Sequence, residues 1–135
     1  MAITTPIDVQ FGDCDPAGIV YYPTLFHYCH VAFERAWGEA LGVAYADLIR
    51  NERLGYPTVH VVADFLSPAR YGDTVSMKVW VSKVGVSSVV FEFGGSVDGR
   101  AILRASHTKV CMNLDTLAKT DIPSHHRTNF EALHG

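Results

Sequence analysis

Two aspartates lie two positions apart in a short segment rich in glycine and proline, directly before a long apolar stretch. The segment reads GDCDPAG over residues 12–18, and the apolar stretch that follows is typical of a helix. The N-terminus of a helix offers unpaired backbone N–H groups and a partial positive charge, which together stabilise a developing oxyanion. A carboxylate a few residues upstream can act at the same point, as a nucleophile or as a general base for water. This combination of groups is typical of acyl transfer.

The residues of this segment, taken alone, leave other interpretations open. Asp-x-Asp-Pro is good turn chemistry, so Asp13 and Asp15 are also candidates for turn or capping residues. Cys14 is a nucleophile by residue type. The two carboxylates beside it disfavour its thiolate, however, and we expect an inert thiol.

Three residues of the expected helix have the spacing of metal ligands. His27, His30 and Glu34 follow one another at i, i+3 and i+7 and therefore share one helix face. The pattern contains no second helix that would complete a ligand set, so we expect no bound metal. The alternative for His30 is a core histidine with a hydrogen-bonded partner.

The elements that must position these groups follow from the hydrophobic periodicity. A helix is expected over about Thr24–Leu41, with Pro23 in its first turn and Gly42 at its end. Its residues are apolar around most of the circumference, which predicts a helix buried nearly all round. A shorter helix is expected over Tyr45–Glu52 and another within residues 123–135. Alternation with a period of two predicts five strands, over Thr4–Phe11, Thr58–Leu66, Asp73–Lys83, Ser87–Val97 and Arg100–Asn113.

This order of elements predicts an α+β fold in which a five-stranded antiparallel sheet is wrapped around a long central helix, with one face of the sheet covered. At 135 residues and 14.8 kDa, we expect residues 1–135 to form a single domain. An apolar share of 48% excludes a disordered chain. Charged residues make up only 19%, which indicates that part of the surface is covered by another subunit.

The charge and the cysteine content limit which classes of partner and which cellular compartment we expect. The net charge is −3, and the basic residues form no run that would neutralise several phosphates, so we expect no nucleic-acid partner. No apolar stretch is long enough to cross a bilayer, and the N-terminal segment has no secretory-signal pattern. Three cysteines without metal-type spacing favour reduced thiols, and hence a cytoplasmic protein.

The segment from Gly12 to Pro23 resembles the signature G-D-x-D-x-x-G-[IV]-V-[YW]-[YH]-P of the 4-hydroxybenzoyl-CoA thioesterase family of the hot-dog fold. The resemblance covers nearly the whole chain, and the matching positions are Gly12, Asp13, Asp15, Gly18, Val20, Tyr21, Tyr22 and Pro23. It implies hydrolysis of an acyl-CoA thioester without a metal or an organic cofactor. It also implies that Asp15 attacks the thioester carbonyl or activates water, while the Tyr22 N–H polarises the carbonyl oxygen. Asp13 is then mostly structural.

The same resemblance suggests where the acyl group binds. His30 lies two turns after Tyr22, at a position where aryl-CoA members of the family carry an aspartate that binds a ring hydroxyl. We therefore expect an aromatic or a short-to-medium acyl group, contacted by Gly18, His30, Tyr56, Pro57 and His60. The family's site lies between the subunits of a homodimer or homotetramer, with the acyl group reaching from one Asp15 loop towards the neighbour's strands.

The CoA portion is expected near a turn between two strands. Where some relatives carry paired arginines, this chain has Gly85 and Val86, so the candidates for CoA contacts are Lys83, Ser87 and Ser88. Arg104 and the cationic segment at residues 125–127 are further candidates for phosphate or nucleotide contacts. Two other functions stay open on this fold: a non-catalytic module that binds acyl-CoA or an acyl carrier, and a dehydratase. The dehydratase ranks last because such enzymes depend on a histidine paired with an acidic residue, a pattern that is not visible here.

Overall fold

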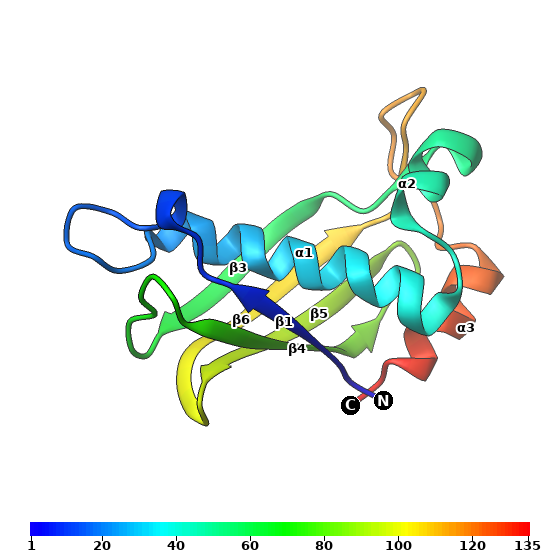
Figure 1. The fold of residues 1–135 in the computed structure, drawn as a ribbon. Coiled ribbons are helices and arrows are strands. Elements are labelled where there is room, and N and C mark those ends of the chain that lie inside the picture. The colour runs from blue at the N-terminus through cyan, green and yellow to red at the C-terminus, as the bar shows by residue number, and fades with distance from the viewer.

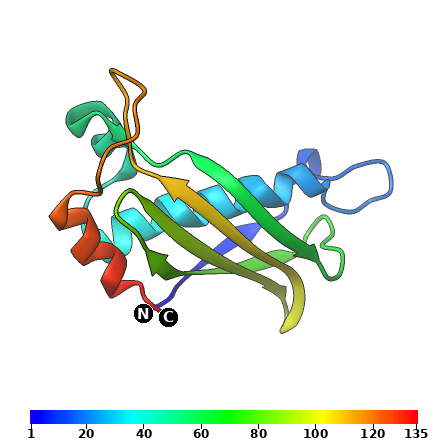
Figure 2. The same cartoon turned by 180° about the vertical axis from the view of Figure 1, so that it is seen from behind.

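The computed structural model describes residues 1–135, except for the side chain of Leu41. A five-stranded antiparallel sheet curves around one long helix, α1, which lies across a single face of the sheet (Figure 1). The view from behind shows the opposite face of the sheet without a helix over it (Figure 2). The strands of the sheet are β1 (Ile3–Asp8), β3 (Thr58–Phe65), β4 (Thr74–Val84), β5 (Ser88–Val97) and β6 (Arg100–Val110). The other elements are η1 (Phe11–Asp13), α1 (Tyr22–Leu41), α2 (Tyr45–Asp47), η2 (Leu48–Glu52), β2 (Leu54–Gly55), β7 (Met112–Asn113) and α3 (Ser124–Ala132).

The strand order is β1-β4-β5-β6-β3, so β1 and β3 form the two edges. The predicted fold class and the five predicted strands are thus confirmed. Helix α1 begins at Tyr22, two residues earlier than expected, with Pro23 in its first turn. Strand β1 ends at Asp8 instead of Phe11, because residues 11–13 form a 3-10 turn. The small β2–β7 pair was not expected; it forms where the last predicted strand leaves the main sheet.

The sheet covers only one side of α1. Leu25, Cys29 and Phe33 are buried on the side that faces the strands, whereas Glu34 and Arg35 are exposed on the other side. The expectation of a helix buried nearly all round is therefore wrong for a single chain. Most of the apolar side chains that suggested it are buried in the core, and only a few, such as Phe26 and Val31, are half-buried.

The core lies between α1, the inner face of the sheet and α3. Six aromatic side chains pack edge to face or tilted within it, at ring centroid distances of 5.0–6.3 Å: Phe33, Trp37, Tyr45, Tyr56, Phe91 and Phe130. Such offset arrangements are the favoured ones for aromatic pairs. The inner face of β6 adds two polar side chains to this apolar core, His107 and Lys109, which are 6% and 3% exposed.

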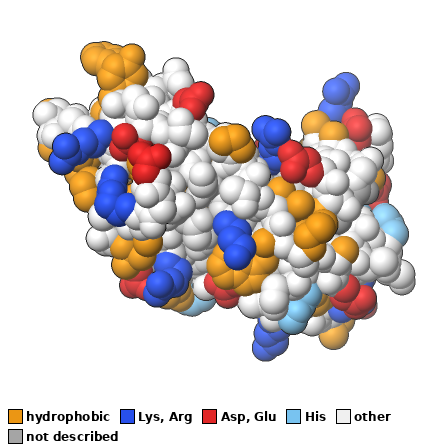
Figure 3. Space-filling view, turned by 60° about the horizontal axis from the view of Figure 1, so that its bottom comes forward, with side chains coloured by type: hydrophobic (Ala, Val, Ile, Leu, Met, Phe, Trp, Pro, Cys, Tyr) orange, Lys and Arg blue, Asp and Glu red, His pale blue; other side chains and the backbone are white. Residues whose placement is uncertain are grey.

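The outer surface carries charges of both signs. On the face shown in Figure 3, acidic and basic side chains are interspersed with hydrophobic ones. Among the described residues, no helix is both long enough and apolar enough to cross a membrane.

Candidate active site

Residues 14–20 form a small loop that is tied to the rest of the fold at several points. Bridges join Cys14 to Val20 and Ile19 to Arg70. The N–H of Val20 donates to Ala69 O at 2.9 Å. These bonds hold the loop against the start of α1.

Gly18, which was expected to contact substrate, closes the turn of this loop. It adopts a φ of +82°, and its N–H donates to Asp15 O at 2.9 Å. A left-handed backbone favours glycine, because a Cβ would be strained there. Conformation alone therefore accounts for a glycine at this position.

Asp13 connects the loop to the helix. Its Oδ2 accepts hydrogen bonds from the Tyr28 hydroxyl at 2.6 Å and from the Gln10 N–H at 3.0 Å. Burial and the neighbouring Asp13 carboxylate raise the pKa of the Tyr28 hydroxyl well above its usual value, so Tyr28 remains a donor. These contacts fit the structural role expected of Asp13.

Asp15 presents a carboxylate at the surface of the loop. It is half-buried, and its Oδ1 accepts a hydrogen bond from the Ala17 N–H at 2.9 Å. That bond fixes the side chain as an Asx turn. Among the described residues, the other carboxylate oxygen has no donor within hydrogen-bond distance, which leaves it free to act on a bound molecule.

The start of α1 leaves the Tyr22 backbone N–H free. The first N–H groups of a helix have no acceptor within the helix. Here the Tyr21 N–H donates to Asp13 O at 3.1 Å, and the Thr24 N–H donates to Tyr21 O at 2.8 Å. Pro23 has no N–H at all. The Tyr22 N–H has no acceptor among the described residues.

Asp15 and Tyr22 line the same cavity of about 510 Å³, which we call the loop cavity. Its other walls are mostly apolar and include Leu25, Phe65 and Pro68. The rings of Tyr22 and Phe65 pack edge to face with centroids 5.9 Å apart. A residue with a free carboxylate oxygen and a residue with a free backbone N–H therefore border the same largely apolar cavity, and acyl transfer uses groups of these two kinds.

A second cavity of about 340 Å³, the lysine cavity, lies further along α1. Three residues predicted to contact the acyl group, His30, Tyr56 and Pro57, line it together with Thr58 and Lys109. The structure thus brings these three together, but on a different cavity from Asp15. Lys109 was not singled out by sequence reasoning, because a lysine in an alternating strand is normally taken as solvent-facing.

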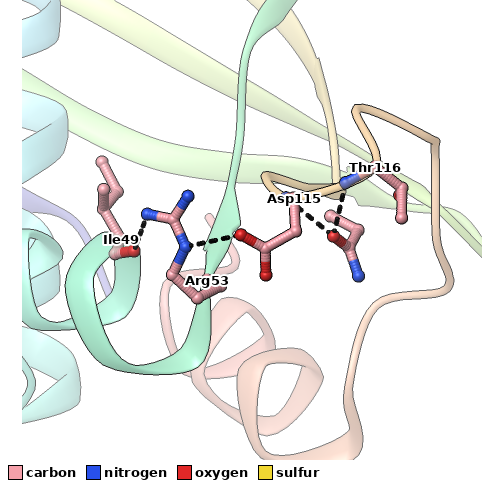
Figure 4. Close-up of polar contacts among 5 residues, drawn as sticks. Ile49, Arg53, Asp115 and Thr116 are labelled. Atoms are coloured by element: carbon pink, nitrogen blue, oxygen red, sulfur yellow. Dashed lines mark hydrogen bonds and ion pairs between the residues drawn. The ribbon is translucent and has the colours of Figure 1, made fainter.

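One wall of the lysine cavity is formed by residues 49–57 and the turn after β7. Arg53 links the two parts: its Nε donates to Asp115 Oδ1 at 3.0 Å, and its Nη1 donates to Ile49 O at 3.2 Å (Figure 4). Asn113 closes the turn by accepting hydrogen bonds from the N–H groups of Asp115 and Thr116. This wall therefore has a fixed backbone.

Of the three residues with metal-type spacing, His30 pairs with Glu34. Its Nε2 lies 2.9 Å from Glu34 Oε1 at the rim of the lysine cavity, while His27 is exposed. A different group of possible ligands is found at the start of α3. Ligand atoms of Glu52, His125 and His126 lie within 4.8 Å of one another. The hydrogen bonds from both imidazoles to Glu52 Oε1, at 2.9 and 3.1 Å, account for this arrangement without an ion.

The remaining predicted contacts lie away from Asp15 within one chain. His60 is exposed on the edge strand β3, and Arg104 is exposed on β6. The turn between β4 and β5, with Lys83, Ser87 and Ser88, lies at the opposite end of the molecule from the Asp15 loop (Figure 1). In the cationic segment, Arg127 donates to Gly85 O at 2.8 Å and so holds this turn.

The three cysteines are free thiols. Cys29 and Cys111 are buried, and Cys14 is half-buried. Burial raises the pKa of Cys29 to about 12, which keeps it protonated. The raised pKa makes Cys29 a poor nucleophile.

Comparisons with known proteins agree with the fold and the motif. A model of the Thioesterase-like superfamily matches residues 9–130. The chain is 29% identical over 123 residues to a 1,4-dihydroxy-2-naphthoyl-CoA hydrolase of Nostoc punctiforme, covering 91% of this chain and 82% of that protein. A gentisyl-coenzyme A thioesterase structure superposes with a TM-score of 0.86 at 30% identity, covering 93% of this chain and 99% of that one.

The 4-hydroxybenzoyl-CoA thioesterase from Pseudomonas sp. strain CBS-3 superposes with a TM-score of 0.86 at 23% identity. That alignment covers 95% of this chain and 98% of the other, and it bears on the fold alone. The predicted hot-dog fold is confirmed, and so is the family resemblance. The chain is an enzyme that belongs to the Thioesterase-like superfamily.

Proposed function

We propose that this protein, acting through residues 1–135 as one hot-dog domain, hydrolyses an acyl-CoA thioester with an aromatic acyl group. The observation that carries the proposal is the loop cavity, a largely apolar space lined by both Asp15 and Tyr22. Relatives named for dihydroxynaphthoyl-CoA and gentisyl-CoA support an aromatic acyl group.

In the proposed reaction, the Tyr22 N–H and the N-terminus of α1 stabilise the oxyanion that forms when the carbonyl is attacked. Asp15 either attacks the carbonyl carbon or removes a proton from the attacking water. The C–S bond breaks, and the CoA sulfur leaves as a thiolate that takes up a proton. Water supplies the oxygen of the free acid, directly or by hydrolysing an Asp15 anhydride. No cofactor enters this scheme.

We also propose that the working unit contains a second copy of the chain, paired through β3. This edge strand exposes a row of hydrophobic side chains: Val59, Val61, Val62 and Phe65 are 41–59% exposed. An exposed hydrophobic edge strand favours pairing with another strand. The other edge, β1, contains Pro6, which opposes such pairing.

Symmetric pairing of β3 has a consequence for the site. Two identical edge strands related by a two-fold axis run antiparallel, so the Thr58 end of one copy lies against the Phe65 end of the other. Thr58 borders the lysine cavity and Phe65 borders the loop cavity. The proposed dimer therefore turns the lysine cavity of one copy towards the loop cavity of its partner. The same rotation carries Lys83, Ser87 and Ser88 towards the partner's loop.

A thiol-release assay over a panel of aryl and aliphatic acyl-CoA thioesters tests this function. We expect turnover of aryl-CoA substrates, and a loss of turnover in Asp15→Asn, because an amide is neither a nucleophile nor a base here. Asp98→Asn, the same substitution in the β5–β6 turn, is the matched control. Full activity of Asp15→Asn would contradict the mechanism. If the protein instead binds acyl-CoA tightly without turnover, and Asp15→Asn leaves this binding unchanged, the protein is a non-catalytic binding module.

A further inference from the structure

Lys109 is a cation placed inside the fold without an acidic partner. Its side chain comes from the inner face of β6, and the residue is only 3% exposed. None of the ion pairs among the described side chains includes it. A buried ammonium group is unfavourable unless it is paired, so the absence of a carboxylate requires an explanation.

The groups that do contact the amine are neutral. Its Nζ donates to Thr58 Oγ1 at 2.8 Å and lies 4.2 Å from the centre of the Phe33 ring. An ammonium group has three N–H donors, so these contacts leave donor capacity unused. Burial lowers the pKa of Lys109 to about 8. The amine is therefore charged in most molecules at neutral pH.

The environment of the amine is short of negative charge. His107, the next inward-facing residue on β6, has a pKa lowered to about 4 by burial and by the charges of Lys109 and His30, so it stays neutral. Its Nε2 is buried without a hydrogen-bond partner. Glu34, which also lines the cavity, is bonded to His30 at the rim and is half-exposed. The interior of the lysine cavity therefore offers a cation and an aromatic wall to a molecule that enters it.

We propose that Lys109 is a specificity-determining residue that binds an anionic oxygen at the far end of the acyl group. The chemical class is an aromatic acyl-CoA whose ring carries an ionised hydroxyl or a carboxylate. Tyr45, Tyr56 and Pro57 supply the flat apolar walls that fit such a ring. This inference rests on the proposed hydrolase function and on the pairing through β3, which directs the lysine cavity towards the partner subunit's Asp15.

Two matched substrate pairs test the proposal. We would measure kcat/KM for 4-hydroxybenzoyl-CoA against benzoyl-CoA, and for 4-carboxybenzoyl-CoA against 4-methylbenzoyl-CoA. The first pair reports on a phenolic oxygen and the second on a carboxylate. The wild type is expected to prefer the oxygen-bearing member of at least one pair by about 10-fold or more, as expected for a hydrogen bond to a charged group.

Lys109→Met keeps the length of the side chain and removes the charge. It should lower kcat/KM for the preferred oxygen-bearing substrate by about 10-fold or more, and change that for its partner by less than about 3-fold. Lys78→Met, the same substitution on the outer face of β4, should leave both values unchanged. An equal effect of Lys109→Met on both members of the preferred pair, or no preference of the wild type in either pair, would overturn the proposal.

Binding to the Asp15→Asn protein separates this inference from the proposed function. In that background, calorimetry measures affinity for the intact thioesters without hydrolysis. Adding Lys109→Met should weaken binding of the preferred oxygen-bearing thioester and spare its partner. If the wild type hydrolyses none of the thioesters, the proposed function fails, and this binding difference still decides the role of Lys109. If hydrolysis requires Asp15, but Lys109→Met leaves the ratio of kcat/KM values within each substrate pair unchanged, only the inference about Lys109 fails.

Discussion

The two cavities along α1 differ in how their polar groups are satisfied. At the loop cavity, backbone and side-chain hydrogen bonds fix Asp13 and Asp15, and the groups left free lie at an open surface. At the lysine cavity, Lys109 is buried over the aromatic core and has only neutral contacts. The first arrangement suits a reaction that needs water and an oxyanion, whereas the second suits recognition of a charged group. Each chain thus carries both halves of the proposed site, but at different ends.

The largest expected effect concerns the loop cavity, where we place the reaction. Asp15→Asn should lower kcat by about 10³-fold on the best substrate, because a carboxylate that acts as base or nucleophile typically contributes a factor of this size. The thiol-release assay measures it, with Asp98→Asn beside it. If Asp15→Asn keeps the wild-type kcat, the loop cavity is not the reaction site, and the proposed difference in role between the two cavities is wrong.

The next effect concerns the strand that joins the two ends. Val62→Lys places a charge on the exposed part of β3 and should convert the oligomer to a monomer, since lysine on an edge strand opposes pairing. We expect activity to fall by about 10-fold or more, because each site needs a second copy. Light scattering gives the oligomeric state. Thr4→Lys, on the other edge strand β1, is the matched control and should stay oligomeric; a fully active Val62→Lys monomer would contradict the account.

A smaller effect concerns the lysine cavity, where the buried amine of Lys109 affects the free energy of unfolding. The pKa of Lys109, about 8, lies below the value in the unfolded chain. The unfolded state therefore binds more protons between about pH 8 and 10.5, and the free energy of unfolding should rise with pH in that window. Below pH 8 the cost of the buried charge is fully present. Lys109→Met should then raise the free energy of unfolding at pH 7 by about 2 kcal/mol. Urea denaturation measures it, and a clear destabilisation would mean that the amine already has sufficient partners.

A second effect on stability, of similar size but confined to acidic pH, concerns His107, which lies beneath α1 between the rings of Phe26 and Phe93. Its pKa of about 4 lies below the unfolded value, so the folded state resists protonation. The contribution of His107 to stability is complete above about pH 6.5 and is lost as the pH falls towards 4. We expect the free energy of unfolding to drop by about 2 kcal/mol between pH 7 and pH 5. His107→Phe should remove most of this dependence in urea denaturation; an unchanged pH profile would assign the dependence to other groups.

The two cavities also differ in what the sequence reveals. Residues 12–23 place a carboxylate, a turn glycine and a helix start within one short stretch, so local chemistry and the family signature both identify them. The lysine cavity is assembled from α1, α2, η2, β2, β3, β6 and β7, which span residues 22–113 of the chain. Periodicity places Lys109 in a strand, but only the packing of α1 over β6 shows that the amine faces inward. The exposure of one side of α1 was missed for a related reason, because an apolar helix does not reveal how many layers cover it.

A heterodimer of two variants tests the composite site most directly. Asp15→Asn and Lys109→Met chains carrying different affinity tags are co-expressed, and the doubly tagged dimer is assayed on the preferred oxygen-bearing substrate. If each site combines Asp15 of one copy with the lysine cavity of the other, one of the two sites is intact, and activity should be about half that of the wild type. If both cavities serve a single chain, neither site is intact, and activity should stay near or below about one-twentieth of the wild type, given a 10-fold loss from Lys109→Met. The account predicts the first result, and the second would contradict it.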